Sequence, residues 1–110
     1  MSPRVSVVTS VFNGQRYLEE SIDSILGQSF GDFEFLILNN GSTDRTPQIL
    51  DRYDDPRLRV IHQPNIGIAA SLNKGIDLAQ APLIARVDAD DYSYSDRLQV
   101  QLAYMDQYPD

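Results

Sequence analysis

The stretch VSVVTSVFNG, residues 5–14, decides the fold of this chain. Residues 5–12 form a nearly continuous run rich in β-branched side chains. Such a run is typical of a strand that is buried on both faces, and strands of that kind belong to parallel sheets covered by helices. Asn13 and Gly14 end the strand, because both residues favour turns. The sequence therefore predicts a buried strand within an α/β fold.

The rest of the chain alternates between helix-like and strand-like segments. Three more strands are predicted at residues 33–38, 58–62 and 83–87. Four helices are predicted: residues 15–28, a second that starts near Thr43 or Asp44, a third with Ile68, Leu72, Ile76 and Ala79 at helical spacing, and residues 95–108. This alternation predicts a three-layer α/β/α architecture with a mainly parallel, Rossmann-like sheet. Ligands of such sheets bind beyond the carboxyl ends of the strands, where the strand order reverses direction.

Gly75 lies inside the third predicted helix. A glycine there costs about 1 kcal/mol of helix stability relative to alanine. We therefore expect close packing against the neighbouring layer at this position.

Composition narrows the class of protein. The chain has 110 residues, which fits one domain or a piece of one, and it contains no cysteine, which suits a reducing compartment. The start MSPRVSVVTSVF lacks the long apolar stretch of a signal peptide, so we expect a cytoplasmic protein, peripheral at the inner face of the membrane in its full-length form. Nine basic and 16 acidic residues give a net charge of −7, which argues against nucleic acid as a partner.

The segment DADD, residues 88–91, places three carboxylates at the end of the last predicted strand. Carboxylates this close repel one another unless a positive group lies between them, and that group could be a divalent cation or an arginine. Asp88 and Asp90 offer the oxygen ligands that Mg²⁺ or Mn²⁺ prefers. The alternative is an acidic turn in which Asp91 caps the next helix, and an isolated D-x-D is more often such a turn. No G-x-G-x-x-G and no P-loop motif is present, so a diphosphate would need a cation as intermediary.

Other polar residues also allow two interpretations. Asn13 is a turn residue or N-cap that could meet a ligand beside Ser10, and Asn40 is either the first residue of a tight turn or a group that points into the binding crevice. Lys74 is a solvated helix side chain or a ligand contact. His62 has no second histidine or cysteine with which to form a metal site, so we interpret it as structural.

Four segments together resemble the amino-terminal half of the family 2 glycosyltransferases, an inverting group with the GT-A fold. They are VSVVTSVFNGQRYLEESIDSILGQSF, FEFLILNNGSTDRT, NIGIAASLNKGI and ARVDADDYSYSDRLQVQL. They match the family's opening strand and helix, its D-D-G-S-T-D turn, its third helix, and its D-x-D metal motif with the helix that follows. The resemblance covers nearly all 110 residues in order, and it makes the metal interpretation of DADD the preferred one.

The resemblance implies a role for particular residues. Ser10, Phe12 and Asn13 match the segment that lines the nucleotide, and Asn40 matches the aspartate that contacts the base. Asp88 matches the aspartate near the ribose and the metal, Asp90 matches a direct metal ligand, and Lys74 lies in a segment that lines the pocket in some members. The implied cofactor is Mn²⁺ or Mg²⁺. The implied reaction transfers a sugar from a nucleotide-diphospho-sugar to a hydroxyl of a glycan or lipid-linked acceptor, as in polysaccharide, glycolipid or cell-envelope glycan synthesis.

The chain departs from the family pattern in three respects. Asn39 and Asn40 replace the two aspartates of D-D, so we expect a UDP- or dTDP-sugar to be favoured with weakened discrimination between bases. Ser95 stands where proline is more common. The chain ends at Asp110, whereas the family continues for at least as long again. Residues 1–110 are therefore expected to be the donor-binding half, with the acceptor site and the general base beyond Asp110, no transfer activity alone, and self-association.

Two other classes of function compete with a glycosyltransferase. A non-catalytic nucleotide-binding module would bind nucleotide with a metal but transfer no sugar. A flavodoxin-like or response-regulator interaction domain would also gather aspartates at strand ends. A response regulator needs an acidic pair after its first strand, and SVFNG contains no acid.

Overall fold

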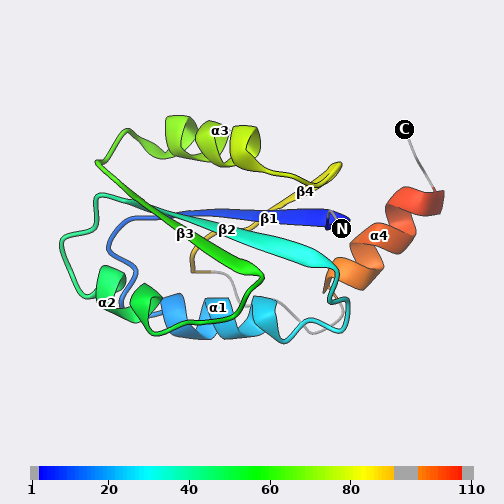
Figure 1. The fold of residues 1–110 in the computed structure, drawn as a ribbon, viewed down its shortest axis with the longest axis horizontal. Coiled ribbons are helices and arrows are strands. Elements are labelled where there is room, and N and C mark those ends of the chain that lie inside the picture. The colour runs from blue at the N-terminus through cyan, green and yellow to red at the C-terminus, as the bar shows by residue number, and fades with distance from the viewer. Residues whose placement is uncertain (1–2, 91–96, 108–110) are drawn as a thin grey trace.

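The computed structural model describes residues 3–90 and 97–107. Within them, strands β1 (Val5–Val11), β2 (Phe33–Asn40), β3 (Leu58–Gln63) and β4 (Leu83–Arg86) form a parallel sheet in the order β3-β2-β1-β4. Helices α1 (Leu18–Leu26) and α2 (Thr46–Asp51) lie against one face and α3 (Ile68–Leu78) against the other, while α4 (Arg97–Gln107) lies near the amino end of β1 (Figure 1). The three-layer α/β/α architecture predicted from the sequence is confirmed.

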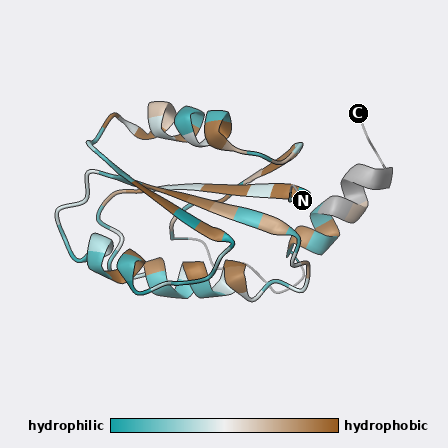
Figure 2. Cartoon of the chain, in the orientation of Figure 1, coloured by the Kyte–Doolittle hydropathy of each residue, from teal (hydrophilic) through white to brown (hydrophobic). Residues whose placement is uncertain are grey.

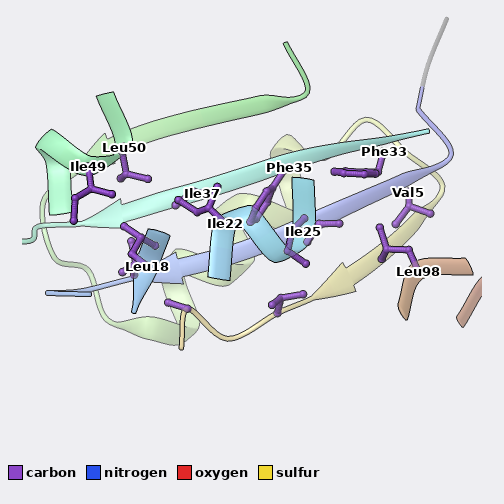
Figure 3. Close-up of a cluster of buried hydrophobic side chains, with 14 residues drawn as sticks. Val5, Leu18, Ile22, Ile25, Phe33, Phe35, Ile37, Ile49, Leu50 and Leu98 are labelled. Atoms are coloured by element: carbon purple, nitrogen blue, oxygen red, sulfur yellow. The ribbon is translucent and has the colours of Figure 1, made fainter. Parts of the chain in front are cut away.

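The larger part of the core lies between the sheet and α1. Val7 of β1 and Phe35 and Ile37 of β2 are buried there against Ile22 and Ile25 of α1 (Figure 3). Leu98 at the start of α4 completes this core. In Figure 2 the helices alternate between brown and teal, as expected for helices with one buried face.

The smaller part of the core lies between the sheet and α3. Val8 of β1 packs there with Leu36 and Leu38 of β2 and Leu72 of α3. A β-carbon on Gly75 would lie 2.5 Å from Val8 Cγ1 and 2.8 Å from Leu38 Cδ1, so α3 approaches the sheet closely at this glycine. The close packing expected at Gly75 is confirmed.

The apolar residues of α3 are not all buried. Ile68 and Ile76 are 61% and 44% exposed, whereas Ser71, Leu72 and Gly75 are buried. The helix thus packs through Ser71, Leu72 and Gly75, and the missing side chain of Gly75 allows the close approach to Val8 and Leu38. Of the predicted apolar positions at helical spacing, Leu72 is thus buried, whereas Ile68 and Ile76 are not.

Several element boundaries also differ from the sequence prediction. β2 runs two residues further than predicted, so Asn40 is its last residue and not the start of a turn; the turn follows at Gly41, which has a φ of 77°. Residues 15–17 form a turn before α1, and α2 begins at Thr46, whose backbone N–H is held by the Asp44 carboxylate at 2.8 Å. The last helix was predicted over residues 95–108, and its positions 95, 96 and 108 lie outside the described residues. Asp91 lies outside them as well. No described helix has the length and apolar content needed to span a membrane.

Candidate functional site

The candidate site lies where the strand order reverses direction. Strands β2 and β3 follow β1 on one side of it, whereas β4 lies on the other side of β1. Loops that follow neighbouring parallel strands on the two sides of such a point leave a crevice at the carboxyl edge of the sheet. The segments after β1 and β4 therefore define the position of the site, and they carry Asn13 and Asp88.

Strand register brings several predicted residues to one face of this edge. Ser10 lies two residues after Val8, which packs against α3, so Ser10 faces the same side of the sheet. Asn40 lies two residues after Leu38, also on the α3 side, and its register partner on β3 is Gln63. The sheet thus presents Ser10, Asn40 and Gln63 together on its α3 face.

Hydrogen bonds connect these side chains to α3. The Ser10 hydroxyl donates to the Ser71 Oγ at 2.8 Å, and Ser71 is fully buried. Gln63 Nε2 donates to the same Ser71 Oγ at 3.1 Å and to the Asn40 Oδ1 at 3.1 Å. A chain of polar groups therefore runs from β1 through α3 and β3 to β2 beneath the carboxyl edge.

The orientation of the Asn40 amide is fixed by a backbone donor. Ile66 N–H donates to Asn40 Oδ1 at 3.0 Å, and a backbone N–H has no acceptor role, so the oxygen must face it. Asn40 Nδ2 then donates to Asn65 Oδ1 at 3.4 Å. Both lone pairs of the Asn40 oxygen are engaged by Gln63 and Ile66, and the residue is 3% exposed. In this structure Asn40 holds the 63–67 loop, and its predicted contact with a nucleotide base stays a prediction.

Asn13 joins the loop after β1 to the loop after β2. It has a φ of 54°, a left-handed conformation that asparagine adopts more readily than most residues. Its side-chain Oδ1 accepts from Thr43 N at 2.7 Å, and its own N–H donates to the Ser42 hydroxyl at 2.9 Å. Asn13 therefore shapes the edge of the site by fixing the two loops to each other. Neighbouring Phe12 is 49% exposed, so its ring is available to a ligand.

The start of α2 belongs to the same loop junction. The Asp44 carboxylate accepts from Thr46 N at 2.8 Å and from Gln15 N at 3.3 Å. Desolvation acts to raise the pKa of Asp44, but the hydrogen bonds from Thr46 and Gln15 outweigh it and lower the pKa. The ionised carboxylate thus holds together the segments that follow β1 and β2.

Asp88 and Asp90 lie just beyond β4. Val87 and Ala89 are buried in the core on the α1 side, whereas Asp88 and Asp90 are exposed. Strand alternation directs the Asp88 carboxylate away from the core, and Asp90 is exposed in the turn formed by residues 89 and 90. Two exposed carboxylates fit Mg²⁺ or Mn²⁺, which takes one or two protein carboxylates and completes its shell with phosphate oxygens and water. Among the described residues no cluster of three or more His, Cys, Asp or Glu side chains exists, so a complete metal cage is not formed there by protein groups alone.

Among the described residues, no hydrogen bond joins Lys74 or His62 to Ser10, Asn40, Asp88 or Asp90. Lys74 is exposed on α3 and has no hydrogen bond or ion pair within the part of the chain that the structure describes. His62 lies in β3, where its Nδ1 is 3.0 Å from Asn39 Nδ2 and its Nε2 is 3.6 Å from Asp51 Oδ1. These contacts agree with the structural role predicted for His62.

Sequence reasoning missed Gln63 and Ser71. Both look like ordinary polar residues of a strand end and a helix, and only the packing of α3 on the sheet brings them to Ser10 and Asn40. One signal was available, because a serine among the apolar and small residues of the third helix marks a position where the helix contacts polar groups.

Comparison with known proteins assigns the family. The family model described as Glycosyl transferase family 2 matches residues 6–110. The chain belongs to glycosyl transferase family 2. The uncharacterized glycosyltransferase EpsJ of Bacillus subtilis is 42% identical over 94 residues, which are 84% of this family 2 chain and 27% of EpsJ. The chondroitin synthase of Pasteurella multocida is 34% identical over 102 residues, which are 91% of this chain and 11% of that protein. The chain thus spans about a quarter or less of the length of these two relatives.

Solved structures of glycosyltransferases share the fold. S. aureus TarS in complex with UDP-GlcNAc is 28% identical with a TM-score of 0.87, and the match covers 94% of this family 2 chain and 31% of TarS. The mannosyltransferase PcManGT of Pyrobaculum calidifontis, in complex with GDP-Man and Mn²⁺, is 26% identical with a TM-score of 0.86, over 96% of this chain and 33% of PcManGT. The fold is therefore that of the GT-A glycosyltransferases.

Proposed function

We propose that this chain is the donor-binding half of a glycosyltransferase. It binds a nucleotide-diphospho-sugar with the help of Mn²⁺ or Mg²⁺, and the sugar passes to a hydroxyl of a glycan or lipid-linked acceptor. The observation that carries the proposal is the position of Asp88 and Asp90, exposed beyond β4 at the reversal of the sheet, next to the loop that bears Phe12 and Asn13. The nucleotide sugars bound to TarS and PcManGT, which have the same fold, support it.

In this proposal each side chain has a separate task. Asp88 and Asp90 hold the divalent cation, and the exposed ring of Phe12 forms a wall of the nucleotide pocket. Ser10 and Asn13 keep the loops around the nucleotide in place through their contacts with Ser71 and Thr43. A cation held there would supply positive charge to the diphosphate and to the leaving nucleotide. UDP or dTDP is the proposed nucleotide. The location of the full-length protein at the inner face of the membrane stays a prediction.

Calorimetric titration of UDP, dTDP, CDP and GDP tests the proposal. We expect at least one of these nucleotides to bind in the presence of Mn²⁺ and to bind at least ten-fold more weakly in EDTA. Asp90→Asn should abolish the difference between Mn²⁺ and EDTA, because it removes a charged ligand. Asp54→Asn is the matched control, since Asp54 is exposed in the turn before β3, at the opposite edge of the sheet.

Two outcomes would contradict the proposal. If no nucleotide binds in the presence of Mn²⁺ or of Mg²⁺, the proposal that the chain binds a nucleotide-sugar donor is wrong. If the Asp90→Asn variant keeps the full response to Mn²⁺, the metal site lies elsewhere. Metal-dependent binding combined with no sugar transfer by a protein that has the full length of its relatives would favour a non-catalytic binding module instead.

A further inference from the structure

The donor site needs more positive charge than a single cation supplies. The chain has a net charge of −7, and the carboxylates that hold the cation offset much of its charge. A nucleotide diphosphate is itself strongly anionic. We propose that Arg86 binds the phosphate groups of the donor, beside the cation at Asp88 and Asp90. This inference rests on the proposed function and names a residue of the same site.

Register fixes the direction of the Arg86 side chain. Arg86 is the last residue of β4, and its partner on β1 is Val8, which packs against Leu72 of α3. Paired residues of a parallel sheet face the same side, so Arg86 lies on the α3 face together with Ser10. Its neighbour Ala85 packs on the opposite side, in the core near α1.

The α3 face of the sheet is open at β4. Helix α3 packs mainly on β1 and β2, and Ile84, two residues before Arg86, is 44% exposed. Arg86 is exposed as well. A parallel sheet usually has both faces covered, so an uncovered strand that bears an arginine beside the crevice is a surface suited to a ligand.

Arg86 has no competing partner in the described structure. Within residues 3–90 and 97–107 it makes no hydrogen bond or ion pair. Arg57, in contrast, is bound by Asp55 at 2.9 Å and stacks on the Phe33 ring. A guanidinium without a carboxylate partner keeps its whole donor fork free, and that fork matches the oxygens of a phosphate group.

Spacing allows Arg86 and the carboxylates to act on one ligand. Two residues of an extended chain span about 7 Å, so Arg86 and Asp88 lie within the length of one arginine side chain of each other along the same face. A diphosphate at the carboxyl end of β4 could therefore meet the cation and the guanidinium at the same time. Lys74 and Arg59 are also exposed cations on the α3 side with no partner in the described residues, but they lie on α3 and β3 and not in the strand that leads to Asp88.

Binding of a nucleoside and of its diphosphate to variants of the chain tests this inference. Isothermal titration would compare uridine with UDP and guanosine with GDP, in Mn²⁺ and in EDTA. Arg86→Gln should weaken binding of the diphosphate about ten- to a hundred-fold and leave binding of the nucleoside unchanged, because only the diphosphate contacts the guanidinium. Arg86→Lys keeps the positive charge but lacks the paired N–H donors of the guanidinium. Its affinity for the diphosphate should lie between those of the wild type and Arg86→Gln. Arg59→Gln is the control, since Arg59 is an exposed strand arginine whose register partner Leu36 also faces α3, at the far edge of the sheet.

The outcomes separate the two proposals. If the wild type binds a diphosphate and Arg86→Gln binds it equally well, Arg86 has no role at the phosphates and the proposed function still stands. If Arg86→Gln weakens nucleoside and diphosphate binding by the same factor, the residue acts on the pocket as a whole and the phosphate assignment is wrong. If the wild type binds no diphosphate at all, the proposed function fails and this inference fails with it. Circular dichroism of each variant checks that the fold is retained.

Discussion

At the scale of single residues, the amide of Asn40 makes hydrogen bonds that the carboxylate of the family pattern could not all make. Its oxygen accepts from Gln63 and from the backbone of Ile66, and its nitrogen donates to Asn65. An aspartate could accept the first two hydrogen bonds but could not donate the third. Because Asn40 is buried, the missing donor would leave two oxygens facing each other without water between them.

We therefore predict that Asn40→Asp destabilises the chain. Asn65 cannot turn away freely, since its Oδ1 also accepts from Gly67 N at 2.9 Å. The expected loss is about 1–3 kcal/mol of unfolding free energy, which corresponds to roughly 4–8 °C in melting temperature per kcal/mol for a chain of this size. Thermal unfolding followed by circular dichroism measures it, with Asn73→Asp at an exposed position of α3 as the control.

The same variant separates loop fixing from base recognition. If Asn40 only holds the 63–67 loop, Asn40→Asp should change the affinities for UDP and CDP by the same factor. A carboxylate that faced the base would instead sharpen the preference for UDP, because it accepts from the N3–H of uracil and repels the N3 acceptor of cytosine. A stable Asn40→Asp variant with a sharpened preference would show that the loop contacts seen here are not the main role of the residue.

At the scale of elements, the sequence predicted the strands better than the helix faces. The run at residues 5–12 and the second strand are rich in apolar and β-branched side chains at successive positions, a pattern typical of strands buried on both faces. The third helix has apolar residues on more than one side, and its spacing did not show that Ile68 and Ile76 are exposed while Leu72 is buried. The decisive feature was Gly75, since the missing side chain determines which face of α3 reaches the sheet.

Gly75→Ala tests this account of α3. Alanine favours a helix by about 1 kcal/mol over glycine, but its β-carbon would lie far inside the contact distance of Val8 and Leu38. Overpacking of this kind costs about 1–3 kcal/mol, so we expect a net loss of stability in urea unfolding. Asn73→Ala, at an exposed position of the same helix, should cost nothing.

A second substitution makes the prediction specific. In a Val8→Ala background the methyl group that lies nearest to the added β-carbon is gone, so Gly75→Ala should cost less there than in the wild type. Equal costs in the two backgrounds would mean that α3 does not contact the sheet at Val8.

At the scale of the whole molecule, the arrangement of the strands around the candidate site was predictable, but the contacts within that site were not. Alternation of strands and helices implies a parallel sheet, and a parallel sheet places the segments after its strands at one edge; Ser10, Asn40 and Asp88 were found from that rule together with the family pattern. The Asn13 contact with Thr43 joins residues 30 positions apart through a left-handed turn, and no local pattern encodes it. Such contacts depend on how the loops meet after the sheet has formed.

Strand β4 lies at one edge of the sheet. In the described residues β4 pairs with β1 alone, so its other edge carries unpaired backbone groups beside the exposed Ile84. An exposed edge with an apolar side chain favours pairing with a second copy of the chain. We expect the 110-residue chain to self-associate in light scattering at high concentration.

Ile84→Lys should reduce this self-association, because a charge on an edge strand opposes pairing with another strand. Val100→Lys is the matched control. Val100 is 58% exposed on α4, so this substitution adds the same charge at an exposed apolar position of a helix and not of the edge strand. If edge pairing drives association, Ile84→Lys shifts the molecular mass towards the monomer and Val100→Lys does not. A wild-type chain that stays monomeric at high concentration, or a Val100→Lys variant that dissociates as readily as Ile84→Lys, would show that the edge of β4 does not join two copies.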